Sequence, residues 1–220
     1  MKQPLWKRLL SYLTEVHLES ASTDLNPTLH LALRKGRYCL TTPNAIYSYG
    51  DLYDNFLRAF RKLDLDKMAI QDVLILGFGM GSIPYMLEKV FHKNYRYVGV
   101  EQDEVIALWA SRYVLRELRS PVQLQIADAR RFTEYCEEKF DLVVVDIFVD
   151  DVVPPAFEEP GFLEALQNLL SDNGLLLYNR LTAQPGDQRA TTVFFEDVFK
   201  KTFPKATFLD VHGNWMLKNH

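Results

Sequence analysis

The feature that most constrains this chain is an apolar run that leads directly into a glycine-rich turn. Residues 73–76 are valine, leucine and isoleucine only, and Gly77, Gly79 and Gly81 follow them. A second continuous apolar run covers 142–145. Strands of this kind are buried on both faces, which is typical of a parallel sheet covered by helices. From about residue 71 onward, the sequence therefore predicts strands that alternate with helices.

The rest of this region fits the same alternation. Strands are expected at 73–76, 97–101, 122–127, 142–146 and 175–178. Helices are expected between them at about 82–91, 104–118, 130–138 and 160–170, and again at 191–203. Two further strand-like pieces, 206–211 and 215–218, flank the turn signal His212-Gly213-Asn214. Such a pattern predicts a closing antiparallel hairpin.

The first part of the chain has a different pattern. Apolar residues recur at steps of three and four between Trp6 and Val16, which predicts a helix. Alternation over 29–42 around Lys35-Gly36 predicts a β-hairpin, and Asp51 is expected to be the N-cap of a following helix. We therefore expect a small N-terminal helix and hairpin extension over 1–65 and a ligand-binding α/β domain over 66–220.

Composition excludes several classes of protein. The chain has 220 residues, 48% of them hydrophobic, which is too apolar for a disordered protein. Its net charge of −4 disfavours a nucleic-acid partner. Cys39 and Cys136 cannot build a disulfide framework or a four-cysteine zinc site, and the histidines lack ligand spacing, so no metal is expected. No apolar run reaches about 18 residues, so no membrane partner and a cytoplasmic location are expected.

The glycine-rich turn is the first candidate binding feature. Glycines allow the backbone to approach a ligand closely, and the helix that follows offers free N–H groups to an anionic or polar ligand. A tight turn that binds nothing is the alternative. Glu101 closes the next expected strand, 20 residues after Gly81. An acid at that place accepts hydrogen bonds from ribose hydroxyls, or it caps the next helix, a role that Asp103 could take instead.

The spacing of the glycines helps to choose the ligand. A dinucleotide site favours Gly-x-Gly-x-x-Gly, whereas here the third glycine comes one place early. Gly-x-Gly-x-Gly followed by a ribose-binding acid resembles the S-adenosylmethionine fold of class I methyltransferases. This resemblance implies that Asp128 and Ala129, after the third strand, lie at the adenine. Asp128 could equally be a helix N-cap, and the two roles are compatible.

Asp146 is a third candidate, because it ends the buried run 140–146. Ligands bind at the carboxyl edge of open parallel sheets. A carboxylate there can accept hydrogen bonds from the amino-acid part of a cofactor or from an amine substrate. Asp150 and Asp151 follow in the next loop, and we interpret them as solvated acids.

These motifs resemble one branch of the class I fold, the spermidine/spermine synthases. Val100-Glu101-Gln-Asp103-Glu-Val105-Ile106 is similar to the family's Glu-Ile-Asp-x-x-Val-Ile, and Phe140 to Asp146 is similar to its fourth strand. The resemblance implies a Rossmann-like class I methyltransferase fold. It implies cofactor contacts from Gly77, Gly79, Gly81, Glu101, Asp128, Ala129 and Asp146. It further implies that Asp146 and the polyamine-contacting Tyr47 act in catalysis.

The chain also departs from that family. The acid of the family's glycine loop is replaced by Met80, and the Asp-Glu pair before the tyrosine by Pro43-Asn44. Since Met80 cannot attract the ammonium of decarboxylated S-adenosylmethionine, we expect a methyltransferase that uses S-adenosylmethionine on a small acceptor. The alternatives are an aminopropyltransferase that makes polyamines and a non-catalytic nucleoside-binding protein; an NAD oxidoreductase is disfavoured. If the chain assembles with itself, we expect a homodimer.

Overall fold

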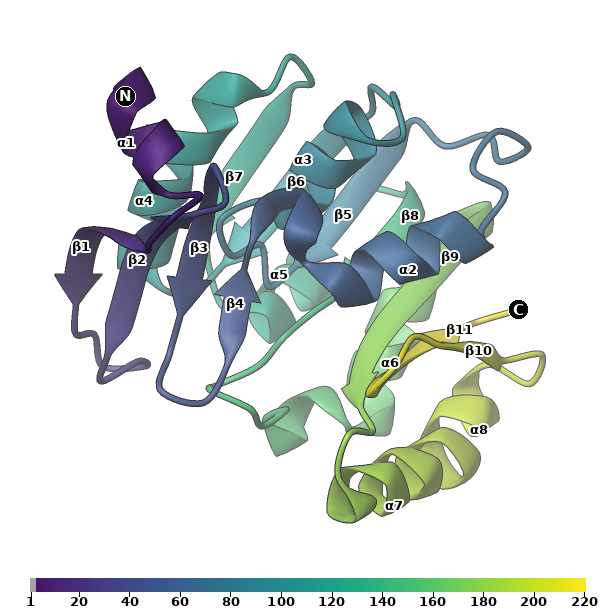
Figure 1. Cartoon of the computed structure of the whole chain (residues 1–220). Helices are drawn as coiled ribbons and strands as arrows, with labels where there is room; N and C mark the ends of the chain where they lie inside the picture. The colour runs from purple at the N-terminus through teal and green to yellow at the C-terminus, as the bar shows by residue number, and fades with distance from the viewer. Residues whose placement is uncertain (1–2) are drawn as a thin grey trace.

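The computed structural model describes residues 3–220 and contains two sheets (Figure 1). The larger sheet has seven strands in the order β10-β11-β9-β8-β5-β6-β7. Its strands are β5 (Asp72–Leu76), β6 (Arg96–Glu101), β7 (Val122–Ile126), β8 (Phe140–Val145), β9 (Leu170–Leu181), β10 (Thr207–Asp210) and β11 (Asn214–Lys218). The adjacent strands β7, β6, β5, β8 and β9 pair in parallel. Strand β11 is antiparallel to both β9 and β10. The predicted Rossmann-like fold with a closing antiparallel hairpin is confirmed.

Helices cover both faces of this sheet. They are α2 (Asp54–Lys62), α3 (Ser82–Lys89), α4 (Glu104–Trp109), α5 (Ala129–Tyr135), α6 (Pro160–Leu169), α7 (Pro185–Phe194) and α8 (Lys200–Thr202). Val73 and Ile75 pack into one hydrophobic cluster with α2, α3 and α4, while Leu74 and Leu76 pack into another with α5, α6 and α7. The continuous apolar run is thus explained, because successive side chains of β5 enter opposite cores.

The smaller sheet is built from the N-terminal part of the chain. It contains β1 (Val16–Ala21), β2 (Leu29–Arg34), β3 (Arg37–Thr41) and β4 (Ile46–Ser48), all antiparallel. The predicted hairpin is its centre, and β1 and β4 extend it on both sides. Leu31 and Leu33 share a cluster with Val73, so this sheet packs on the core of the larger one. The division at residue 65 stays a prediction.

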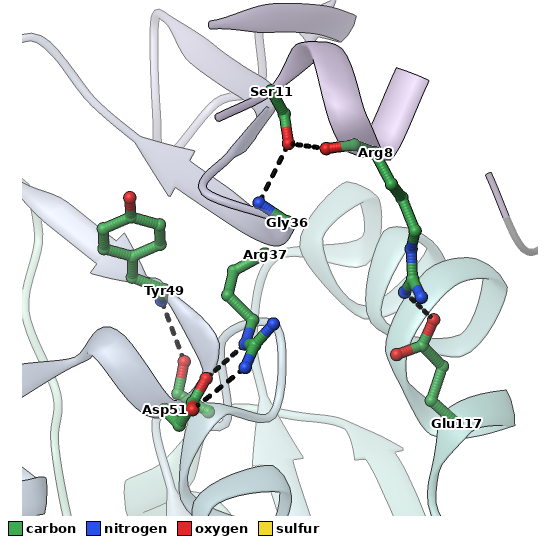
Figure 2. A network of polar contacts seen from close by, with 8 residues as sticks. Arg8, Ser11, Gly36, Arg37, Tyr49, Asp51 and Glu117 are labelled. Carbon is green, nitrogen blue, oxygen red and sulfur yellow. Dashed lines mark hydrogen bonds and ion pairs between the residues drawn. The ribbon is translucent and has the colours of Figure 1, made fainter. Parts of the chain in front are cut away.

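Two local predictions are wrong. The first helix, α1 (Leu5–Leu10), is short, and Val16 begins β1 instead of continuing the helix. Asp51 does not cap α2, because it lies in a 3₁₀ turn (Gly50–Leu52) and forms an ion pair with Arg37 (Figure 2). Tyr53 precedes the first residue of α2 instead. The guanidinium of Arg37 therefore competes successfully with the free N–H groups of the helix for this carboxylate.

Two searches of the described residues give negative results. Between residues 3 and 220, no helix combines the length and the apolar character needed to cross a bilayer. Over the same residues, no group of three or more His, Cys, Asp and Glu side chains is placed to hold a metal ion.

The glycine turn fixes how closely β5 and β8 approach at their carboxyl ends, and this closeness can be tested. Gly77 has φ +82°, and a Cβ atom there would lie 2.2 Å from the carbonyl oxygen of Asp146. We expect Gly77→Ala to lower the free energy of unfolding by about 2–4 kcal/mol, since it adds left-handed strain and overpacking. Urea denaturation followed by circular dichroism measures this.

Gly186→Ala is the matched control, because nothing lies within 4 Å of a Cβ at this position in α7. It should leave stability unchanged or raise it by up to about 1 kcal/mol. Two variants of equal stability would contradict the importance of the Gly77 contact.

Candidate functional site

A cavity of about 730 Å³, its open mouth included, lies at the carboxyl ends of β5, β6 and β8. This is the edge where ligands bind in open parallel sheets. The predicted residues Tyr47, Gly77, Gly79, Glu101, Ala129 and Asp146 all line it. The structure therefore brings together residues from five separate parts of the sequence.

The glycine turn forms the floor of the cavity. The backbone N–H groups of Gly77 and Phe78 both donate to the carbonyl of Val100, each at 3.0 Å, which ties the turn to β6. Gly79 has φ +55°, and its N–H group donates to the Glu101 carboxylate at 2.8 Å. The turn therefore presents backbone to the cavity, with no side chain between a ligand and the sheet.

Glu101 lies on the wall formed by the end of β6. Besides Gly79, the N–H group of Asp103 donates to its carboxylate at 3.0 Å. Burial raises the pKa of Glu101, although these two hydrogen bonds act in the opposite direction. The N–H groups of Gly79 and Asp103 donate to different oxygens of this carboxylate, and a carboxylate oxygen has two lone pairs. Both oxygens can thus accept a further hydrogen bond from a ligand hydroxyl.

Asp146 directly follows β8 on the neighbouring wall. Its two oxygens accept hydrogen bonds from the Tyr53 hydroxyl at 3.0 Å and from the Asn179 amide at 2.8 Å. The oxygen of Asn179 in turn accepts from the amide of Asn214 at 2.9 Å, which orients the Asn179 amide. Burial raises the pKa of Asp146 to about 6, against the effect of Asn179 and Tyr53. The carboxylate is therefore held on both oxygens and titrates close to neutral pH.

Tyr47 links the smaller sheet to the rim of the cavity. Its hydroxyl donates to the side chain of Asn26 at 2.9 Å and accepts from the backbone N–H of Asp150 at 2.5 Å. Burial raises the pKa of Tyr47 to about 12, so the phenol stays protonated at neutral pH. Asp150 is not a free solvated acid, because Thr42 and Asn44 donate to its carboxylate.

The remaining predicted residues lie beside the cavity. Asp128 is the N-cap of α5 and accepts from the N–H of Arg131 at 2.9 Å. Its neighbours Ala127 and Ala129 line the cavity. Gly81 is the N-cap of α3, with φ +79°. Asp103 caps α4, as the alternative assignment for the end of β6 predicts.

Sequence reasoning missed Tyr53, Asn179 and Asn26. Asn179 is a buried polar residue near the carboxyl end of β9, the strand next to β8, so the rule that pointed to Asp146 could have found it. Tyr53 and Asn26 lie in connecting segments without a pattern, and only the folded chain brings them to the cavity.

The chain is similar to two curated proteins, while no family model matches it. It is 28% identical over 110 residues to a polyamine aminopropyltransferase from Vibrio vulnificus. This match covers 49% of this chain and 36% of that protein. It is also 28% identical over 130 residues to a probable polyamine aminopropyl transferase from Bifidobacterium longum, with 59% and 28% covered. The chain thus matches only about a third of the length of these curated relatives.

The fold has a solved counterpart. A probable spermidine synthase from Corynebacterium glutamicum superposes with a TM-score of 0.69, covering 92% of this chain and 78% of that one at 19% identity. At this identity the likeness establishes the fold.

The prediction of a methyltransferase is wrong, because both curated relatives are named as aminopropyl transferases. That prediction also assumed that the side chain of Met80 faces the cofactor, and this assumption fails. Met80 is buried in the hydrophobic core and lines a separate, small cavity with Ser82 and Tyr85, so its side chain does not reach the site. A neutral residue at position 80 therefore says nothing about which cofactor the cavity accepts. The resemblance predicted from the sequence is confirmed: the chain is similar to the spermidine synthase-like branch of the class I S-adenosylmethionine-dependent methyltransferase superfamily.

Proposed function

We propose that this chain transfers the aminopropyl group of decarboxylated S-adenosylmethionine to a small amine. The observation that carries the proposal is the carboxylate of Asp146, held by Tyr53 and Asn179 at the carboxyl edge of the sheet. A carboxylate fixed in this way binds an amine and orients it. The names of the two curated relatives support the same reaction.

The nucleoside of the cofactor would occupy the side of the cavity near β6. Glu101 accepts hydrogen bonds from the ribose hydroxyls, and the bare backbone at Gly77 and Gly79 allows close approach. Ala129, Pro154 and Phe157 give this part of the cavity an apolar surface that suits an adenine ring. Gly81 and Asp128 contribute indirectly, because they begin the helices α3 and α5 that flank the site.

The amine would occupy the side near Asp146. Its nitrogen lone pair attacks the methylene carbon next to the sulfonium, a C–N bond forms, and the C–S bond breaks with its electron pair on sulfur. The products are methylthioadenosine and the aminopropylated amine. With a pKa of about 6, Asp146 is ionised at neutral pH, so it can hold the amine and accept the proton that the nitrogen releases.

Tyr47 would act as a positioning residue. Both hydrogen-bonding directions of its hydroxyl are engaged, by Asn26 and by the backbone of Asp150. Since its pKa of about 12 keeps it protonated, it does not serve as a base. Its role is to hold the loop after β8 against the smaller sheet.

A direct assay tests the proposed function. The purified chain is incubated with decarboxylated S-adenosylmethionine and, in turn, with 1,3-diaminopropane, putrescine, cadaverine and spermidine. Mass spectrometry should detect methylthioadenosine and an amine that carries one added aminopropyl group. Methyl transfer from S-adenosylmethionine, or tight binding of nucleosides without any turnover, would contradict the proposal; the second outcome would favour the nucleoside-binding alternative.

The first prediction for the site concerns Glu101. Glu101→Gln removes the charge that the ribose hydroxyls face, so the affinity for methylthioadenosine should fall by about 1–3 kcal/mol in calorimetric titration. Glu104→Gln, three residues further along at an exposed position of α4, should bind like the unmodified chain. Equal affinities for all three proteins would contradict the ribose assignment.

The second prediction concerns Asp146. Asp146→Asn cannot accept the proton from the amine, so turnover should fall by about 10²-fold or more. Binding of methylthioadenosine should change little, which separates the amine from the nucleoside half of the site. Asp151→Asn, an exposed acid in the following loop, should retain turnover within about twofold. Similar losses in both variants would argue against a specific role for Asp146.

The third prediction follows from the raised pKa of Asp146. Because the folded protein binds this proton more tightly than the unfolded chain does, Asp146 contributes stability at low pH that is lost as the pH rises through about 6. Between pH 4 and 7.5, the unmodified chain should lose about 2 kcal/mol of unfolding free energy relative to Asp146→Asn. Urea denaturation across that range measures the difference, and parallel pH profiles would contradict the raised pKa.

A further inference from the structure

The helix α1 contacts the rest of the protein through polar groups. Arg8 donates to the carboxylate of Glu117 at 2.6 Å, and the hydroxyl of Ser11 accepts from the N–H of Gly36 at 2.9 Å (Figure 2). The carbonyl of Ser11 also accepts from the N–H of Lys35 at 2.7 Å. These contacts fix the helix on the turn between β2 and β3 and beside the 3₁₀ turn Leu115–Glu117.

The apolar residues of the same segment consequently lie outside. No residue of α1 is buried. Leu5, Trp6 and Leu9 are 72%, 61% and 61% exposed, and Leu13 is 88% exposed. We call these four residues the α1 patch. The usual arrangement of an amphipathic helix is reversed here, because its polar side faces the protein and its apolar side faces outward.

The charges around the α1 patch are positive in sum, because each acid there is already paired with a basic residue. Glu117 is paired with Arg8, and Glu15 is paired with His30 and Arg34. Lys7 and Lys35, by contrast, have no acidic partner among residues 3–220, and the ammonium of Lys7 lies 5.7 Å from the centre of the Trp6 ring. The exposed apolar surface is therefore bordered by unpaired cations.

These observations favour a lipid surface as the occupant. A helix of six residues is only about 9 Å long, whereas a stable protein interface needs about 20–30 residues on each side. Leucine and tryptophan beside lysine are typical of segments that insert into the lipid headgroup region. We propose that the α1 patch binds reversibly to membranes that contain anionic lipids, with Lys7 and Lys35 at the headgroups.

This proposal does not rest on the proposed transferase activity. The sequence-based expectation of no membrane partner came from the lack of a long apolar run, and a helix that lies on a surface needs none. The helix α1 lies at the opposite corner of the molecule from α7 (Figure 1).

Vesicle co-sedimentation of the full chain tests the proposal. Vesicles of phosphatidylcholine with 30 mol% phosphatidylglycerol should retain the protein, and pure phosphatidylcholine vesicles should retain at least tenfold less. The double variant Leu9→Gln/Leu13→Gln should lower partitioning at least tenfold. The matched control Leu108→Gln/Val193→Gln changes residues that are 53% and 58% exposed elsewhere, and it should partition within twofold of the unmodified chain.

Charge and fluorescence give independent measurements. Lys7→Glu/Lys35→Glu should abolish retention by anionic vesicles, whereas Lys201→Glu/Lys205→Glu, at exposed positions near β10, should retain it. The tryptophan emission should shift to shorter wavelength on binding, and Trp6→Phe should remove the shift. Of the other two tryptophans, Trp109 is buried and Trp215 stacks on Phe208 in the closing hairpin. No retention by anionic vesicles at physiological salt would overturn the proposal. The proposal would also be overturned if vesicles did not retain the chain and the chain instead associated with itself, in a way that Leu9→Gln/Leu13→Gln abolishes.

Discussion

The structure depends on the close packing of the Gly77 backbone against the carbonyl group of Asp146. The N–H of Asp146 donates to the carbonyl of Leu76 at 2.9 Å, and a Cβ on Gly77 would lie within 2.2 Å of the Asp146 carbonyl oxygen. One backbone contact therefore places the glycine turn and the Asp146 carboxylate in the same cavity. A side chain at position 77 would force the glycine turn away from the backbone of Asp146.

The smaller sheet completes the cavity through a chain of hydrogen bonds. Asp103 accepts from the amide of Asn26 at 2.8 Å, Asn26 accepts from Tyr47, and Tyr47 accepts from the backbone of Asp150. A second connection joins the hydroxyl groups of Ser48 and Ser82 at 2.5 Å, directly behind the glycine turn. The N-terminal sheet is thus part of the site, because it holds both the end of β6 and the loop after β8.

The sequence correctly places the candidate site residues that lie at the carboxyl ends of parallel strands. Glu101 and Asp146 each end a buried run, and parallel strands bring their carboxyl ends to one edge, so position in the pattern was enough to place them. Met80 shows the limit of this reasoning. The backbone angles within a glycine turn decide whether a side chain points to the ligand or to the core. Gly77, Gly79 and Gly81 all have positive φ, so the side chains between them do not point where an ordinary backbone would direct them. Tyr53 and Asn26 could not be predicted, since tertiary packing alone selects them.

The first helix shows a related limit, which concerns polarity. The period of three and four residues places a helix here, although the helix ends at Leu10 and does not extend to Val16. Periodicity also cannot say which side of the helix meets the protein. Here Glu117 and the backbone N–H groups of the β2–β3 turn provide partners for Arg8 and Ser11. Polar contacts of this kind are directional, whereas apolar contact is not, so they determine how the helix is seated. The exposed leucines then follow from the positions of their polar neighbours, and their burial requires a surface outside the chain.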